Sequence, residues 1–266
     1  MEYIWCMLAA IGAGVGTRLA GLSAATVMVP ILIVLCPSFQ GESGAYQATA
    51  IALTSNILGS AVSTGVYIKH KHIDLKHGWI MLCCIVLLCV MGSYMAYKME
   101  NTVLSAFMLI LTFCIGIRFL IKPDTTKKQA ESNAIYWNWK RVAVLLFFGL
   151  TIGFGTGFVG SGGGMMMLVV FTAFLGYERK SAVGTSTFIM TLTALIGFMS
   201  HVWMHPAIIL QKWDILLICI FMTTISSLFA AQFANRVSNR MVGLATSSIL
   251  TALSIILLPL YFYTVR

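Results

Sequence analysis

Glycine and hydroxyl residues interrupt two long apolar stretches of the chain. One interruption reads G-V-G-T-R-L-A-G-L-S-A-A over residues 14–25, and the other reads G-F-G-T-G-F-V-G-S-G-G-G over residues 153–164. Glycine weakens a helix, and non-helical backbone at membrane depth is tolerated only where it is buried or lines a cavity. A half-helix that begins after such a break directs N–H groups and a positive dipole end towards that cavity. The two breaks therefore predict an anion site.

Charged and polar side chains near the breaks are the candidates for binding that anion. Arg18 lies within the first break, and a charge inside an apolar segment is expensive and usually functional. Snorkelling or pairing with a backbone carbonyl is its alternative role. Hydroxyl and amide groups one segment later complete the predicted site, although any one hydroxyl is at least as well explained by a bond to its own helix. The predicted substrate-binding residues are Arg18, Ser23, Ser55, Asn56, Ser161, Gly162, Gly163, Gly164, Thr185, Ser186 and His201.

The glycines have a second explanation, which is close packing of helices through small residues. The unbroken run G-S-G-G-G at 160–164 exceeds what such a contact requires, so the anion site is favoured. We expect the backbone of residues 162–164 to approach the substrate too closely for a methyl group. Gly153, outside the run, is expected to tolerate one better.

The elements that position these residues follow from composition. The chain has 266 residues, of which 59% are apolar and 9% are charged, whereas a soluble domain has about 45–50% and about 25%. A membrane-spanning helix needs about 20 apolar residues. Such segments are predicted at 3–36, 45–68, 78–97, 102–121, 141–175, 181–204, 213–234 and 241–263. The sequence therefore predicts an all-α polytopic membrane protein, whose first and fifth segments are too long for one crossing and must break.

The fifth segment restarts the pattern of the first. Gly14, Gly16, Thr17 and Gly21 align with Gly153, Gly155, Thr156 and Gly160. The prediction is two homologous four-segment halves, residues 1–121 and 141–266, joined by a polar cytoplasmic linker at 122–140, and internal duplication is common in secondary transporters. Lys and Arg divide more unequally between the two sides if the broken segments are re-entrant hairpins, which favours inverted repeats with both termini outside. A single crossing by each broken segment remains the alternative.

Other functional classes find little support in the sequence. The net charge of +9 comes from residues at segment edges, so nucleic-acid binding is not expected. The cysteines lack paired metal spacing, and the histidines of 70–77 and at His201 and His205 are better explained by a solvated loop and by capping than by a metal. Nucleotide-hydrolase and protease motifs are absent, so neither an enzyme nor a cofactor is predicted. No acidic residue falls inside an apolar core, so proton coupling through a buried acid is not expected, although His201 is a candidate proton carrier.

The paired glycine-rich segments, the sequence A-V-G-T-S-T at 182–187, the basic midpoint linker and the four-plus-four layout resemble the TauE/SafE sulfite exporter family along essentially the whole chain. The resemblance implies transport of sulfite, sulfonates, thiosulfate or related small anions. In the family pattern a G-x-G-G-G run is often followed by proline. Here the second half keeps the glycines without the proline, and the first half keeps Pro30 without the glycines, which leaves the substrate open.

The sequence thus predicts a secondary transporter of a small sulfur-containing anion, with sulfite, thiosulfate and organosulfonates as the candidates. The anion binds between half-helix N-termini at the membrane midplane, in a multi-pass protein of the cytoplasmic (inner) membrane. A passive anion channel, and a carrier for metal ions or thiol compounds, are the alternatives. The expected partners are the lipid bilayer and the small anion, and a homo-oligomer is left open.

Overall fold

A computed structural model describes residues 2–265 except for 21, 42, 70, 122–138, 161–162, 178, 208–210 and 234–238. The described part of the chain is helical and contains no strand. The first half comprises α1 (Glu2–Ala20), α2 (Ala24–Leu35), the short η1 (Pro37–Phe39), α3 (Gly44–Lys69), α4 (Leu75–Lys98) and α5 (Asn101–Ile121). The second half comprises α6 (Trp139–Val159), α7 (Gly164–Val169), the π-helical η2 (Val170–Phe174), α8 (Arg179–Met204), α10 (Trp213–Phe233) and α11 (Asn239–Val265).

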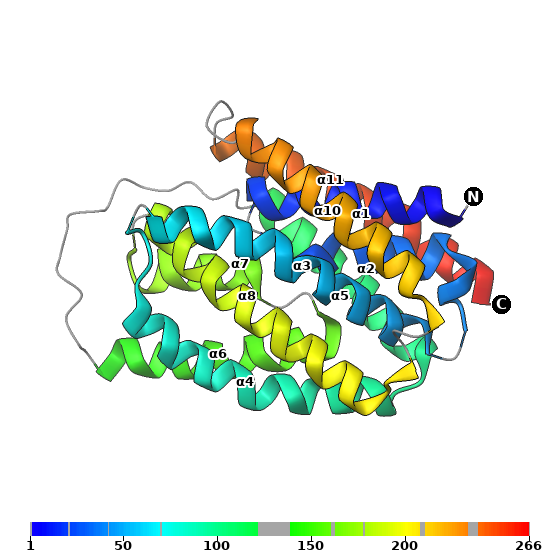
Figure 1. Ribbon diagram of the computed structural model, residues 1–266, viewed down its shortest axis with the longest axis horizontal. Coiled ribbons are helices and arrows are strands. Elements are labelled where there is room, and N and C mark those ends of the chain that lie inside the picture. Colours follow the sequence, from blue (N-terminus) through cyan, green and yellow to red (C-terminus); the bar gives the residue numbers. More distant parts are fainter. Residues whose placement is uncertain are drawn as a thin grey trace.

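Several of these helices are long and apolar enough to cross a membrane. Within the described residues five qualify by length and hydropathy, namely α3, α4, most of α6, most of α8 and most of α10. Large apolar side chains such as Leu87, Phe147 and Phe229 are exposed on the outside of the bundle, where a soluble protein would carry charge. The helices run roughly along one long axis, and both chain ends lie at the same end of it (Figure 1). The predicted all-helical, polytopic membrane protein is confirmed.

Both long segments break where glycine and serine interrupt them. α1 ends at Ala20 and α2 begins at Ala24, and α6 ends at Val159 and α7 begins at Gly164. After the first break the chain doubles back, because α2 packs against α1 with Val27 lying over Gly12 and Gly16. The first segment is therefore a broken helical hairpin.

The broken segment of each half packs against a helix of the other half. α1 packs against α10, and successive contacts join Tyr3 to Asp214 and Thr223 to the carbonyl of Ala10, so these two helices run in the same direction. α6 packs in the same parallel manner against α4. There the missing side chain of Gly153 lets the helix approach the backbone of Ile85.

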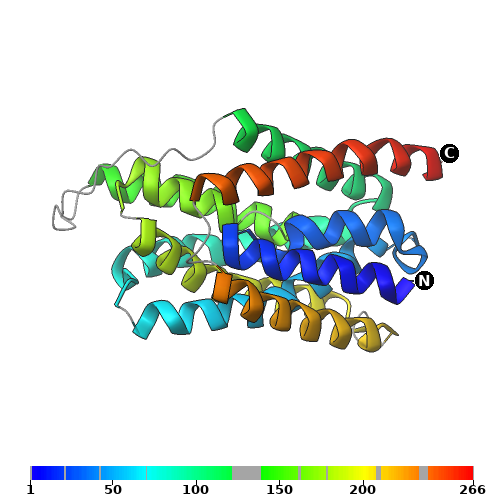
Figure 2. The ribbon, with the colours of Figure 1, turned by 90° about the horizontal axis from the view of Figure 1, so that it is seen from above.

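Two remaining pairs complete the bundle. α3 packs against α8 and α5 packs against α11, and Figure 2 shows α11 lying along α5. The linker predicted at 122–140 lies outside the described residues except for its last two positions, which begin α6.

Contacts between helix termini define the two ends of the bundle. At the end named here the Tyr46 end, the hydroxyl of Tyr46 donates to the carbonyl of His201, and Asn101 accepts from the amide of Ala45. At the opposite end, named the Asp74 end, Asp74 donates its amide to Thr185. α1, α3, α5 and α10 therefore begin at the Tyr46 end, whereas α4, α6 and α8 begin at the Asp74 end.

Candidate functional site

The two helix breaks meet near the middle of the bundle. The hydroxyl of Ser23, at the start of α2, donates a 2.9 Å hydrogen bond to the backbone carbonyl of Gly160, which follows α6. The side-chain carbonyl of Asn56, halfway along α3, accepts a 3.2 Å bond from the amide of Ala24. Ser23 and Asn56 are only 3% and 1% exposed. The structure thus brings Ser23 of the first break against the second break, and Asn56 of α3 against the first.

Gly160 can occupy this position only because it lacks a side chain. Its φ of +74° is in the left-handed region, where other residues are strained. A Cβ there would lie 2.9 Å from Cγ2 of Thr49 and 3.0 Å from Cβ of Ala25. Its amide donates to the carbonyl of Thr156 at 2.8 Å, which closes the last turn of α6. The glycine ends one half-helix and seats that end against α2 and α3.

The rest of the second break is partly described. Gly163 precedes α7, and a Cβ on it would lie 2.9 Å from the terminal methyl of Met167 and 3.6 Å from the hydroxyl of Thr156. Gly164 begins α7 and is buried. Ser161 and Gly162 lie outside the described residues. Arg18 lies in the last turn of α1, and its side chain is also outside what the structure describes.

Gly153 corrects one expectation from the sequence. Its Cβ would lie 2.5 Å from the carbonyl oxygen and 2.7 Å from the Cα of Ile85, and backbone atoms cannot move aside as a side chain can. Gly153 is therefore a packing glycine between α6 and α4, with no room for the methyl group that we expected it to tolerate. Gly163, by contrast, faces the flexible end of a methionine.

Hydroxyl groups lead away from the breaks between α3 and α8. The hydroxyl of Ser60 donates to the carbonyl of Asn56 at 2.6 Å. Thr191 of α8 lies 3.0 Å from the hydroxyl of Ser60 and 3.1 Å from that of Thr64. These four residues form a polar seam that runs from the breaks towards the Asp74 end. The sequence analysis did not select Ser60, Thr64 or Thr191, although residues 56, 60 and 64 recur every four positions and so share one helix face.

Other predicted residues lie apart from the breaks or bond within their own helix. Ser55 donates to the carbonyl of Ile51 at 3.0 Å, and Ser186 donates to that of Val183 at 3.0 Å. Thr185 lies at the Asp74 end, where its hydroxyl accepts the amide of Asp74 at 3.0 Å. Ser55 is next to Asn56, whereas Thr185 and Ser186 are displaced towards one end of the bundle.

His201 lies at the other end. Its ring is fully buried and stacks on Tyr46 with 4.4 Å between ring centroids, and its Nδ1 lies 2.9 Å from the carbonyl of Gly197. Its Nε2 has no hydrogen-bond partner. Sixteen residues of α8 separate His201 from Thr185, or about 24 Å at 1.5 Å per residue. The predicted residues therefore fall into three groups along the long axis, and the breaks form the middle group.

A polar cluster at the Asp74 end was missed by the sequence analysis. One carboxylate oxygen of Asp74 accepts the hydroxyl of Tyr177 at 2.5 Å and lies 2.8 Å from Nδ1 of His77. The other accepts the amides of Lys76 and His77, which caps α4. Burial alone would raise the pKa of Asp74, but the hydrogen bonds from Tyr177 and His77 outweigh it and hold that pKa below its usual value.

The same cluster corrects, for His77, the expectation that residues 70–77 form a solvated loop; Lys71 and Lys76 are exposed, and residue 70 lies outside the described residues. His77 is only 3% exposed, because it belongs to the first turn of α4, where it packs edge-on against Tyr177. The sequence signal was the capping pattern of Asp74 before an apolar run. Among the described residues no group of three or more His, Cys, Asp or Glu side chains is arranged to hold a metal ion.

Comparisons with known proteins agree with a transport role. A family profile described as "Sulfite exporter TauE/SafE" matches residues 6–257. The chain is 25% identical over 214 residues to the probable membrane transporter protein YunE of Bacillus subtilis (strain 168), covering 76% of this chain and 78% of the relative. It is 26% identical over 141 residues to a probable membrane transporter protein of Haemophilus influenzae (strain ATCC 51907 / DSM 11121 / KW20 / Rd), covering 50% and 52%. No solved structure gives a significant match.

Proposed function

Because this chain belongs to the TauE/SafE family of membrane transporters, we propose that it is a secondary transporter that carries a small sulfur-containing anion in a site where its two helix breaks meet. Sulfite, thiosulfate and organosulfonates are the candidate substrates. The sequence resemblance to this family is confirmed by the profile match.

The contact between Ser23 and Gly160 is the observation that carries this proposal. This bond joins the start of α2 to the end of α6 at a buried position. The amide side chain of Asn56 contacts the same start of α2. Helix starts present N–H groups and a positive partial charge, so an oxyanion is the ligand that suits them. Uncharged donors bind such an anion without holding it too tightly to be released.

Without a bound anion, the side-chain oxygen of Asn56 is proposed to occupy one of the anion's hydrogen-bonding positions. That oxygen accepts the amide of Ala24, the first residue of α2. An arriving oxyanion takes over that amide, and the NH₂ group of Asn56 becomes available as a further donor. Arg18, one turn before the break, supplies positive charge from the end of α1.

The two halves are proposed to be inverted repeats that rock against each other to alternate access. The support is the direction of the equivalent helices, since α1 begins at the Tyr46 end and α6 begins at the Asp74 end. α1 pairs with α10 as α6 pairs with α4, and α3 pairs with α8 across the middle. Equivalent pairings of this kind, each between one helix of either half, are expected of a duplicated and inverted unit.

The Asp74 end is proposed to face the cytoplasm. Lys69, Lys71 and Lys76 are exposed there, and the basic linker joins the end of α5 to the start of α6 at the same end. Excess Lys and Arg in short loops marks the cytoplasmic side. A location in the cytoplasmic (inner) membrane follows, with the anion leaving the cell through the Tyr46 end.

A ligand screen tests the proposed substrate class. The melting temperature of the purified protein is measured with sulfite, thiosulfate, sulfate, short sulfonates and short carboxylates, and sulfur oxyanions should raise it in a saturable way. Arg18→Gln should weaken that effect without lowering the yield of folded protein. Stabilisation by carboxylates alone would contradict the proposal of a sulfur-containing substrate. Anion flux in liposomes that is not stimulated by counterflow would instead indicate a passive channel.

A further inference from the structure

One buried nitrogen at the Asp74 end has no partner. His77 is 3% exposed, and its Nε2 is buried without a hydrogen bond. Buried polar atoms are nearly always paired, so an orphan of this kind calls for an explanation. The proposed transport site at the breaks does not use this residue.

The contacts of His77 assign its proton. Asp74 is ionised at neutral pH, because its pKa lies below the usual value, so its carboxylate can only accept hydrogen bonds. Nδ1 of His77, 2.8 Å from that carboxylate, is therefore the donor. In the neutral ring Nε2 then carries a lone pair, and it carries a hydrogen only when the ring is cationic.

Titratable and charged residues lie on the segments next to His77. Asp74 and Tyr177 contact His77 directly. Lys71 and His72 precede α4 and Lys76 belongs to its first turn, and in the sequence Arg179 and Lys180 open α8. The basic residues attract an anion to this end, whereas the negative charge of Asp74 repels it.

We propose that His77 is a second anion contact of the transporter, which binds an oxyanion through Nε2 when its ring is protonated. A buried cationic Nε2–H without an acceptor is costly, and an oxyanion supplies that acceptor. Proton and anion therefore bind cooperatively, each raising the affinity for the other. This contact rests on the proposed function and gives it a proton-sensitive step at the Asp74 end.

The position of His77 suits an anion that passes between the halves. Asp74 and His77 belong to the first half, whereas Tyr177 and Thr185 belong to the second. The polar seam of Asn56, Ser60, Thr64 and Thr191 leads from the breaks in this direction. An anion at Nε2 would lie where the two halves must separate to open the Asp74 end.

Thiosulfate is the probe for this contact, since it stays a dianion between about pH 5 and 8, where histidine changes charge. Its equilibrium binding to purified protein is measured across that range. Affinity should increase as pH falls, by up to about tenfold per pH unit for one linked proton. In His77→Gln the affinity should vary by less than about twofold over the same range. Tyr177→Phe, which keeps the ring and loses its bond to Asp74, should displace the pH profile without flattening it.

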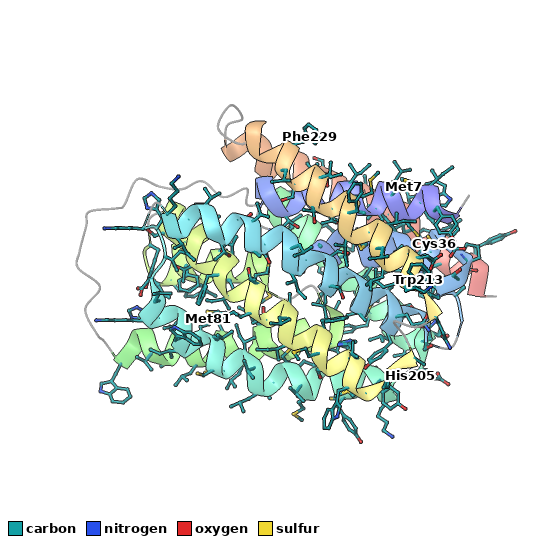
Figure 3. The ribbon with its side chains drawn as sticks, viewed as in Figure 1. Met7, Cys36, Met81, His205, Trp213 and Phe229 are labelled. Carbon is teal, nitrogen blue, oxygen red and sulfur yellow. The ribbon has the colours of Figure 1, made fainter. Side chains whose placement is uncertain are left out.

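A matched control makes the same change at the opposite end. Figure 3 shows His205 far from Met81, which lies one turn beyond His77 on α4. His205→Gln should keep the pH dependence of the unmodified protein. Binding that is independent of pH in the unmodified protein, or equally dependent on pH in His77→Gln, would overturn the second contact and leave the proposed function standing. Failure of every sulfur anion to bind at any pH would instead overturn the proposed function, and the second contact with it.

Discussion

The hydroxyl of Ser23 donates to the backbone carbonyl of Gly160 across 137 positions of sequence. This bond ties the start of one half-helix to the end of another, and both belong to segments that the glycines interrupt. The serine makes no side-chain capping bond to α2, so its hydroxyl is available to the other segment. The two breaks are thus in direct contact.

Placing a negative charge at Asn56 should weaken anion binding. In Asn56→Asp a carboxylate would face the first amide of α2 and compete with the anion for the same positive end. Repulsion in a buried site should lower the affinity for thiosulfate by at least about tenfold, or about 1.4 kcal/mol. Thr54→Val is the control, since that hydroxyl bonds to its own helix. An unchanged affinity for thiosulfate in folded Asn56→Asp would contradict the proposal that the anion binds at the helix breaks.

Alanine at Gly153 and at Gly163 should have different effects. Gly153→Ala forces a methyl group against the backbone of Ile85, so it should lower thermal stability and the yield of folded protein. Gly163→Ala places its methyl group against the flexible end of Met167, with the hydroxyl of Thr156 at ordinary contact distance, so the protein should fold and show a change in anion affinity instead. Melting temperature and anion affinity are measured for both. Equal losses of stability at the two positions would favour packing as the role of both glycines.

The sequence predicts features that depend on neighbouring residues better than features that depend on contacts between distant residues. The breaks were predictable, because glycine acts on the local backbone, and Ala20 and Val159 end their helices within the predicted windows. Partners between helices were not predictable, because packing is set by distant contacts. The sequence around Gly153 therefore does not indicate that the backbone of Ile85 packs against it. The sequence around Thr191 likewise does not indicate its contact with Ser60.

The histidines show the same limit. His77 stands among charged residues in the sequence, which suggests a solvated loop, yet the cap formed by Asp74 places it in a buried helical turn. His201 was assigned to the anion site, and the structure places it at the Tyr46 end against an aromatic ring. Only the arrangement of α3, α4 and α8 shows which end of the bundle each histidine occupies.

Asp74→Asn should destabilise the protein at neutral pH. The variant loses charge-assisted bonds to Tyr177 and His77, so about 1–3 kcal/mol of stability should disappear. The native pKa of Asp74 is depressed, so its stabilisation is present above the unfolded value of about 3.9 and is lost as pH falls through the native pKa. Melting temperatures of the two proteins should differ at pH 7 and converge below about pH 4. A difference that persists in strong acid would contradict a role for the charge.

Transport should respond to the membrane potential. Within the described residues every Asp and Glu lies at a helix terminus or between helices, at Glu2, Asp74, Glu100 and Asp214, and the proposed transport uses no buried acid as a proton relay. An interior-negative potential then favours exit of an anion by about 2.3 kcal/mol per charge per 100 mV. Flux from liposomes under a potassium diffusion potential at fixed pH should be driven by the potential. Flux that follows only a pH step at zero potential would show an electroneutral mechanism.

Backbone hydrogen exchange tests the proposed anion site most directly, because the anion is proposed to bind the backbone amides at the two breaks. Purified protein is exchanged with and without saturating thiosulfate, and peptides covering residues 20–28 and 158–167 are compared with peptides from α5 and α11. Exchange should slow in both break peptides on binding, with little change in α5 and α11. Saturable binding that leaves both break peptides unprotected would contradict the claim that the anion binds where Ser23 meets Gly160.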